Sequence, residues 1–249
     1  MLDSAIPKAA ALIEALSYIQ RFHDKTIVVK VGGSIMDDET ALSNILTDIV
    51  FMNYVNMQPI LVHGGGKAIN QKMEQAGLVP QMVQGRRYTD DRVLAIAEQV
   101  LCNDINRFIV TFIQSQGCEA MGLHPLSSNV LFGEKIYLQG EGGRRIDLGH
   151  VGDVKSVNAR MLQLLVQADS IPCIASIATD QAGGRLNVNR IEEMVHNGTI
   201  SSGMLPKVEA CVHALRAGVS KTHIIDGKIP HSLLLEIYTE AGIGTEIVL

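Results

Sequence analysis

The sequence predicts an α/β fold, a three-layer α/β/α sandwich with helices on both faces of a mostly parallel central sheet. Two observations predict it. Apolar runs of strand length alternate along the chain with segments whose apolar residues recur at helical spacing. Two of those runs, VVKVGGS and LVHGGGKAIN, end in glycines that lead into a helix-like pattern.

The elements follow from this alternation in chain order. Strands are expected within residues 26–34, 57–66, 170–180, 221–227 and 244–249. Helices are expected within residues 37–56, 67–77, 90–117, 158–169, 203–218 and 230–242. Gly77 is a plausible C-cap of the second of these helices. The polar, glycine-rich middle of the chain predicts hairpin strands within residues 129–138 and 141–157.

Residues 1–24 predict a separate N-terminal helix. Acidic Glu14 interrupts its apolar residues, which argues against a signal peptide. Those apolar residues recur at helical spacing and are Ala9, Leu12, Ile13, Leu16, Ile19 and Phe22. Such a helix either packs against the rest of the chain or forms a subunit contact, and residues 25–249 form the main domain.

Composition excludes several function classes. The formal net charge is -5 and aromatic residues are 4% of the chain, so neither a basic stripe nor a stacking platform for nucleic acid is present. No apolar run approaches the ~20 residues of a membrane span. The four cysteines form no CxxC pair, which argues against a metal site or a disulfide scaffold. We therefore expect a cytoplasmic protein with free thiols.

The two glycine turns predict an anion site. Both are expected at the carboxyl ends of parallel strands, where ligands bind in open α/β sheets. Helix N-termini at these ends offer free N–H groups and the positive end of the helix dipole. Neither turn matches the GxGxxG or GxxxxGK[ST] spacing. Tight packing alone is the other explanation of the glycines.

Positively charged side chains strengthen this prediction. Lys30 lies within an apolar strand, two residues before Gly32; it either faces a phosphate or is an edge-strand lysine whose ammonium reaches solvent. Lys207 lies where a helix would begin, a position that is unfavourable for a cation unless it faces an anion. Arg86 and Arg87 offer a third positive point, suited to a carboxylate. Lysines and glycine-turn N–H groups are what phosphoryl transfer requires.

At this point the chain resembles the amino acid kinase family, and within it the acetylglutamate kinases of arginine biosynthesis. The stretches that carry the resemblance include VVKVGGS, LVHGGGKAIN, GRRYTD, DLGHVGDV, NVN, GTISSGMLPKVEA and HSLLLEIYTEAGIGT. They run from about residue 26 to the end of the chain. The resemblance implies ATP-dependent phosphorylation of the γ-carboxylate of N-acetyl-L-glutamate, with an N-terminal lobe that binds acetylglutamate and a C-terminal lobe that binds ATP.

The resemblance also implies roles for individual residues. Lys30 and Lys207 would neutralise charge on the transferred phosphoryl group. The substrate would be held by Gly65, Gly66, Arg87 (which would grip its α-carboxylate) and Asn187, and side chains at the two glycines would occupy its place. Gly32 and Gly33 would bring backbone N–H groups to the ATP phosphates. Mg²⁺ would accompany ATP, held largely by phosphate and water rather than by protein ligands.

The N-terminal helix, with ALSYIQRF, resembles the extension of the arginine-inhibited members. The resemblance implies a homo-oligomer, either a dimer or a hexamer of dimers linked through this helix. It also implies feedback inhibition by arginine, with Tyr18 and His231 as the weaker candidates for that site.

The sequence departs from the family after NVN, where roughly 40 family residues that form much of the adenine site have no counterpart beyond Asn189. Either the protein has a segment that this sequence lacks, or the deletion is real and the protein is a poor kinase. Two other functions therefore remain open. One is a regulatory module that binds acetylglutamate and arginine without catalysis, and the other is a kinase for another small carboxylate.

Overall fold

The structure is a computed structural model, and it describes residues 2–188 and 204–248 of the chain. The junction between Asn189 and Arg190, where the sequence departs from the family pattern, lies outside the described residues. None of the helices in the two described ranges has the length and apolar character needed to cross a membrane.

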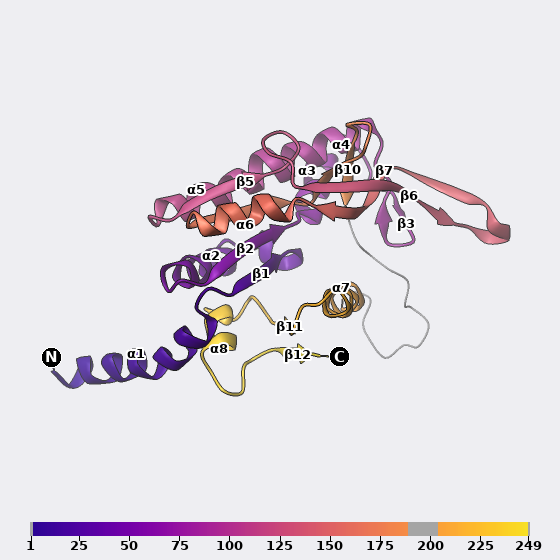
Figure 1. Cartoon of the computed structure of the whole chain (residues 1–249). Helices are drawn as coiled ribbons and strands as arrows, with labels where there is room; N and C mark the ends of the chain where they lie inside the picture. The colour runs from indigo at the N-terminus through magenta and orange to yellow at the C-terminus, as the bar shows by residue number, and fades with distance from the viewer. Residues whose placement is uncertain (1, 189–203, 249) are drawn as a thin grey trace.

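A parallel sheet of four strands forms the centre of the molecule (Figure 1). Its strands, in spatial order, are β1 (Thr26–Val31), β2 (Gln58–His63), β8 (Ser170–Ala175) and β5 (Glu119–Leu123). Every neighbouring pair is parallel. This confirms the α/β prediction, and it aligns the carboxyl ends of β1 and β2 because Val31 pairs with His63 in register.

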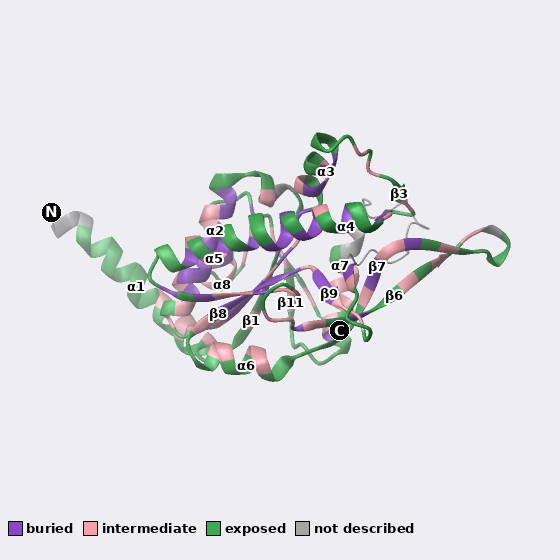
Figure 2. Cartoon of the chain, turned by 90° about the horizontal axis from the view of Figure 1, so that it is seen from above, coloured by how far each residue is buried: buried purple, intermediate pink, exposed green. Residues whose placement is uncertain are grey.

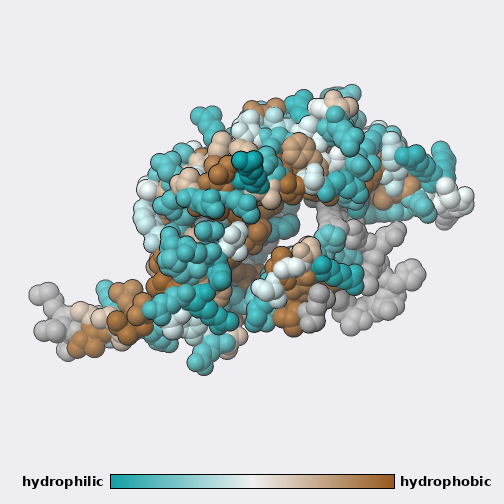
Figure 3. All heavy atoms as spheres, viewed as in Figure 1, coloured by the Kyte–Doolittle hydropathy of each residue, from teal (hydrophilic) through white to brown (hydrophobic). Residues whose placement is uncertain are grey.

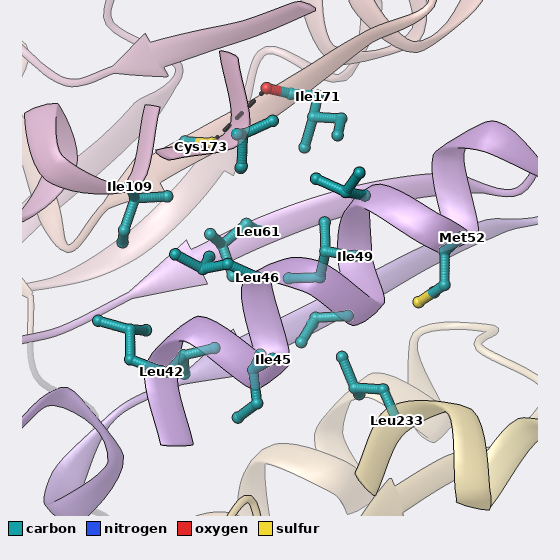
Figure 4. Close-up of a cluster of buried hydrophobic side chains, with 14 of the residues drawn as sticks. Leu42, Ile45, Leu46, Ile49, Met52, Leu61, Ile109, Ile171, Cys173 and Leu233 are labelled. Atoms are coloured by element: carbon teal, nitrogen blue, oxygen red, sulfur yellow. Dashed lines mark hydrogen bonds between the residues drawn. The ribbon is translucent and has the colours of Figure 1, made fainter. Parts of the chain in front are cut away.

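Helices cover both faces of this sheet, which confirms the three layers (Figure 2). One face carries α2 (Glu39–Tyr54) and α5 (Arg107–Ser115), and the other carries α6 (Ala159–Gln167). The core of the first face is built largely from fully buried aliphatic side chains, including Leu46, Ile49, Leu61, Ile109 and Ile171 (Figure 4). Side-chain caps explain where these helices start: Asp38 accepts from the Ala41 N–H and Asn158 from the Met161 N–H.

A third group of helices lies beyond the ends of β2 and β8. It consists of α3 (Gly66–Gln75), α4 (Asp91–Glu98) and the π-helix η2 (Gln99–Asn106), which continues into α5. The sequence predicted one uninterrupted helix over residues 90–117, whereas the structure widens its middle into π geometry. The predicted C-cap at Gly77 is consistent with its φ of +69° directly after the Ala76 cap.

The middle of the chain forms the predicted hairpin, β6 (Leu131–Gln139) with β7 (Arg145–Val157), whose tip is the short helix η3 (Glu141–Gly143). The hairpin projects from the body (Figure 1). Its base pairs with β9 (Ile177–Thr179) and β10 (Arg185–Val188) in a closed ring of strands. A small second hairpin, β3 (Met82–Val83) with β4 (Arg86–Arg87), lies beside it.

The last part of the chain differs from the prediction in one respect. Helix α7 (Leu205–Arg216) begins where the sequence predicted, and α8 (Ser232–Ile237) packs against α2. The strands β11 (Thr222–Ile224) and β12 (Thr245–Ile247), however, pair with each other in antiparallel fashion and do not join the central sheet. Three-residue strands satisfy their backbone groups most simply with a nearby partner.

Helix α1 (Leu2–Phe22) confirms the predicted N-terminal helix and extends away from the body (Figure 1). Four of its large apolar side chains are exposed: Ile6, Leu12, Ile13 and Leu16. They contribute the apolar surface that is visible along this helix (Figure 3).

Candidate active site

The two glycine turns lie side by side. Because β1 and β2 are parallel neighbours, Gly32 and Gly64 both follow the carboxyl edge of the sheet. The Gly64 N–H donates to the carbonyl of Val31, the last residue of β1, at 3.2 Å. An ion pair between Lys67 Nζ and Asp37 Oδ2 (3.0 Å) links the segments that follow the turns. The two predicted ligand sites therefore adjoin.

Protein donors hold the three carbonyl groups of the second turn. The pairs are Gly64 O with His63 Nδ1 (3.4 Å), Gly65 O with the Ile69 N–H (2.9 Å) and Gly66 O with Arg87 Nη2 (2.8 Å). In a planar trans peptide the N–H points away from the carbonyl of the same unit. The N–H groups of Gly65, Gly66 and Lys67 therefore point away from these partners, and the first N–H groups of α3 have no acceptor within the helix. This arrangement suits a negatively charged ligand.

Gly65 is a glycine for a reason that the sequence did not reveal. A Cβ at this position would lie 2.5 Å from Ile105 Cδ1 and 2.9 Å from Leu101 Cδ2, both side chains of η2. The expectation that a side chain here would occupy the substrate's place is therefore wrong for Gly65, because protein already fills that space. A Cβ at Gly66 would have only Arg87 Nη2 within 4.0 Å, so that side of the turn is open.

Lys30 and Lys207 come together from the two ends of the sequence. Lys30 lies on the edge strand β1 and is exposed, as the snorkelling alternative expected, yet its ammonium turns back over the first glycine turn. A Cβ on Gly32 would be 3.7 Å from Lys30 Nζ. Partial burial of the ammonium lowers the pKa of Lys30, and the positive charge of Lys207 lowers it further.

These two lysines lack a carboxylate partner in the described part of the chain. Lys207 Nζ has one weak contact, with the sulfur of Met204 at 3.9 Å. Figure 3 shows the surface hollowed between α7, which carries Lys207, and the body above it. Two close ammonium groups without a counter-ion are favourable only if an anion lies between them. Beside them Gly33 has a φ of +63° and open space where a side chain would be, so this turn also exposes its backbone.

Arg87 is buried, whereas a surface arginine would be solvated. It is 5% exposed, and burial lowers the pKa of its guanidinium. One nitrogen, Nη2, binds the Gly66 carbonyl and the side-chain oxygen of Asn70. Its Nε and Nη1 are buried without an acceptor among the described residues. Unpaired buried donors are costly, and a ligand carboxylate would satisfy them. Arg86 instead pairs with Asp153 at 3.3 Å.

Asn187 reaches the same turn through a short series of backbone hydrogen bonds. It is 3% exposed on β10, where it pairs with Val151 of β7. The next residue, Val188, donates its N–H to Ser176 O (3.2 Å), and the Ser176 N–H donates to His63 O (3.2 Å). The structure thus borders the glycine turn with both Arg87 and the strand that carries Asn187.

The two residues expected at an arginine site lie at opposite ends of α8. The ring of Tyr18 packs against Tyr238, with centroids 5.9 Å apart, just after the helix. His231 precedes the helix, and its Nδ1 lies 2.7 Å from Oδ1 of the fully buried Asp48. Burial raises the pKa of Asp48, which the hydrogen bond from His231 opposes. His231 therefore already has a protein partner, and its role at a ligand site stays a prediction.

The sequence model of the amino acid kinase family matches residues 25–190. The chain belongs to the amino acid kinase family. The acetylglutamate kinase of Caldicellulosiruptor bescii is 35% identical over 288 aligned positions, which cover 99% of this chain and 98% of that protein. The acetylglutamate kinase of Methanococcus aeolicus is 38% identical over 292 positions, which cover 99% of each.

Solved structures show the same family fold. The N-acetylglutamate synthase of Neisseria gonorrhoeae, complexed with coenzyme A and N-acetyl-glutamate, superimposes with a TM-score of 0.81 at 19% identity. That match covers 97% of this chain and 63% of the synthase. An isopentenyl phosphate kinase superimposes with a TM-score of 0.56 at 15% identity over 89% of this chain and all of that one.

The alignments also measure the departure from the family pattern. They run over 288 to 292 positions, whereas this chain has 249 residues, so about 40 positions of these amino acid kinases have no counterpart in it.

Sequence reasoning missed two polar residues at this family site, His63 and Asn106. His63 is 1% exposed at the end of β2, and Asn106 is 2% exposed at the end of η2. Asn106 Nδ2 lies 2.9 Å from His63 Nε2. The histidine inside the apolar run LVHGGG was a usable signal. Nothing local marked Asn106, because its partners, His63 and the Cys173 carbonyl, are distant in the sequence.

Replacing Arg87 with lysine is expected to weaken acetylglutamate binding by about 10- to 100-fold, because one ammonium cannot bind Gly66 O and Asn70 while also facing a carboxylate. Calorimetric titration with acetylglutamate measures this. Arg92→Lys, an exposed site on α4, is the matched control and should bind normally. Equal affinity in the Arg87 variant would remove this residue from the binding site.

His63 is expected to make folding sensitive to acid. Burial lowers its pKa from 6.5 to about 4. The unfolded chain therefore binds a proton between these values that the folded chain excludes, and the free energy of unfolding falls as the pH falls through this window. The loss approaches about 3 kcal/mol below pH 4. Denaturant unfolding at pH 7 and pH 4 should show a smaller loss in His63→Gln than in the wild type, and an equal loss in the two proteins would contradict this prediction.

Proposed function

We infer that this protein is an acetylglutamate kinase: it transfers the γ-phosphoryl group of ATP to the γ-carboxylate of N-acetyl-L-glutamate and forms N-acetylglutamyl 5-phosphate, the second step of arginine biosynthesis. One observation carries this inference. Relatives named acetylglutamate kinase match the chain over nearly their whole length. The site described above has the charges that such a transfer needs.

The residues divide between the two substrates. Arg87, Gly66 and Asn187 border the acetylglutamate side, where the α-carboxylate meets the unpaired donors of Arg87. Gly32 and Gly33 face the ATP phosphates. Both the phosphoryl donor and its acceptor are anionic. Two lysines at their junction therefore stabilise the charge that spreads over the phosphoryl group in the transition state.

Lys30 and Lys207 have to act from opposite sides of that group, because one lies on β1 of the N-terminal lobe and the other in the first turn of α7. Mg²⁺ enters with ATP as part of that substrate. Among residues 2–188 and 204–248 no group of three or more histidine, cysteine or acidic side chains is placed to hold a metal ion. We propose that phosphate and water supply most of the ion's ligands, the usual arrangement for Mg²⁺ bound with a nucleotide.

A coupled assay of ADP release tests this function. Turnover should require both N-acetylglutamate and Mg-ATP, and glutamate without the acetyl group should not replace the substrate. Faster turnover with another small carboxylate would indicate a different kinase of the same family.

A second function, a regulatory module that binds acetylglutamate without catalysis, is favoured by the roughly 40 positions that the alignments leave without a counterpart. We place that gap after Asn189, in the ATP-binding lobe. Calorimetry separates the two functions. Acetylglutamate binding without any ADP release would support the module, and turnover would exclude it.

We further propose that α1 is a contact between copies of the chain, in a dimer or a hexamer. Its exposed apolar side chains, such as Leu12 at 66% and Ile13 at 72%, are the support. Removal of residues 1–22 should lower the number of chains per particle, as measured by light scattering, with the acetylglutamate affinity unchanged. An unchanged number of chains per particle would assign the helix another role.

Arginine as a feedback inhibitor belongs to the same proposal. Tyr18, on α1, and His231 lie at the two ends of α8. An arginine molecule bound beside α8 would therefore link α1 to the C-terminal lobe. Titration with arginine tests it, and a lack of measurable affinity would remove arginine from the function.

A further inference from the structure

The widened helix η2 contacts the second glycine turn at two points. Leu101 and Ile105 fill the space beside Gly65, and the next residue, Asn106, contacts His63. A π-helix adds a residue to the turn and is frequent at functional sites. In this chain the π-helix lies against the glycine turn, which makes it a candidate for a functional role.

The direction of the Asn106 amide is determined by its surroundings. Its Nδ2 lies 2.9 Å from the carbonyl oxygen of Cys173, which can only accept a hydrogen bond. Nδ2 is therefore the amino end of the amide, and its second hydrogen is available to His63 Nε2 at 2.9 Å. The amide oxygen packs against the backbone of β5, where a Cβ on Gly122 would lie within 2.2 Å of it. Turning the amide over would place its oxygen against the Cys173 carbonyl and lose that hydrogen bond.

This direction selects one form of His63. Since Asn106 donates to Nε2, that nitrogen accepts and the hydrogen of the neutral ring is on Nδ1. Nδ1 faces Gly64 O at 3.4 Å. The Gly64 carbonyl and the Gly65 N–H belong to one planar peptide unit and point in opposite directions. A hydrogen bond to the carbonyl therefore turns the Gly65 N–H toward the substrate side.

We propose that Asn106 is a positioning residue for acetylglutamate binding, which it supports by selecting the Nδ1–H form of His63 and so holding the Gly64–Gly65 peptide with its N–H toward the substrate. This rests on the proposed function, because it takes acetylglutamate as the ligand of the turn. Asn106 itself does not touch the substrate.

Asn106→Asp tests the proposal with almost no change in shape. A carboxylate donates nothing, so His63 would place its hydrogen on Nε2, and the bare Nδ1 would then repel Gly64 O. Long-range ¹H–¹⁵N spectra of the histidine side chains should show an Nδ1–H ring for His63 in the wild type and an Nε2–H ring in the variant. Calorimetry should show acetylglutamate binding weakened by about 10-fold or more, the value of one buried hydrogen bond.

The chain offers a matched control in Asn103→Asp, which makes the same substitution on the same helix at an exposed site. It should leave both the spectrum and the affinity unchanged. If Asn106→Asp does not fold, His63→Gln probes the pair from its other side and should weaken binding similarly. If both fold, the double variant should add little to either single loss, since the two residues act as one unit.

The outcomes separate the two proposals. An Nε2–H ring in the wild type, or normal affinity in folded Asn106→Asp, would overturn the positioning role. A wild type that binds no acetylglutamate would refute the proposed function, and the substrate named here with it. A general loss of structure would weaken Mg-ATP binding as well, whereas the positioning role predicts that the affinity for Mg-ATP is unchanged.

Discussion

Replacing either Lys30 or Lys207 with alanine is expected to lower the rate of phosphoryl transfer by about 10²- to 10³-fold, the effect of removing one preorganised positive group from a transition state. The two ammonium groups are close enough for Lys207 to lower the pKa of Lys30. In the described part of the chain neither has a carboxylate partner. Their charge is therefore available to the substrates, and its loss falls on kcat more than on acetylglutamate affinity.

The coupled ADP assay and calorimetry together measure this prediction. Lys221→Ala is the matched control, because Lys221 lies just after α7, the helix that carries Lys207, and pairs with Glu246 at 2.8 Å. It should retain full turnover. The removal of Lys207 should also raise the pKa of Lys30, so Lys207→Ala should shift any alkaline limb of the rate profile that arises from Lys30 to higher pH. Full activity in both lysine variants would exclude the lysines from catalysis.

Replacing Gly149 with alanine is expected to disturb the contacts through Thr89 that hold Arg87 in place. Gly149 lies in β7 with a φ of +73°, and an added Cβ would be 2.1 Å from Thr89 O. Thr89 in turn donates its hydroxyl to Arg87 O at 3.0 Å, and its own N–H donates to Leu148 O at 2.9 Å. The clash forces these two segments apart, at a stability cost of about 2–4 kcal/mol. Acetylglutamate affinity should fall by at least as much as in Arg87→Lys.

Gly142→Ala is the matched control for this effect. Gly142 is at the tip of the same hairpin with a similar φ of +69°, but nothing lies within 4 Å of an added Cβ. It shares the strain of a positive φ, about 1 kcal/mol, without the clash. Thermal unfolding and acetylglutamate titration of both variants separate strain from contact. Similar losses in the two would show that the contact between the hairpin and Thr89 has no part in binding.

Much of the fold and of the candidate site could be predicted from local sequence patterns. The alternation of strand and helix periods predicts the layers, and the residues VVKVGGS and LVHGGGK mark both turns before any contact is known. Lys30 and Lys207 stand out because a cation inside an apolar strand, or at the start of a helix, is locally unfavourable. These features depend on neighbours in sequence, so they can be predicted without any knowledge of the fold.

The contacts that hold the site in place could not be predicted from the sequence. Gly65 is a glycine because η2 packs against it, and Arg87 is distinguished from Arg86 by its buried, unpaired donors. Asn106 of η2 contacts His63 of β2. The antiparallel pairing of β11 with β12 was likewise not visible in the sequence. Each of these depends on contacts between residues distant in the chain, whose register and packing no local spacing records.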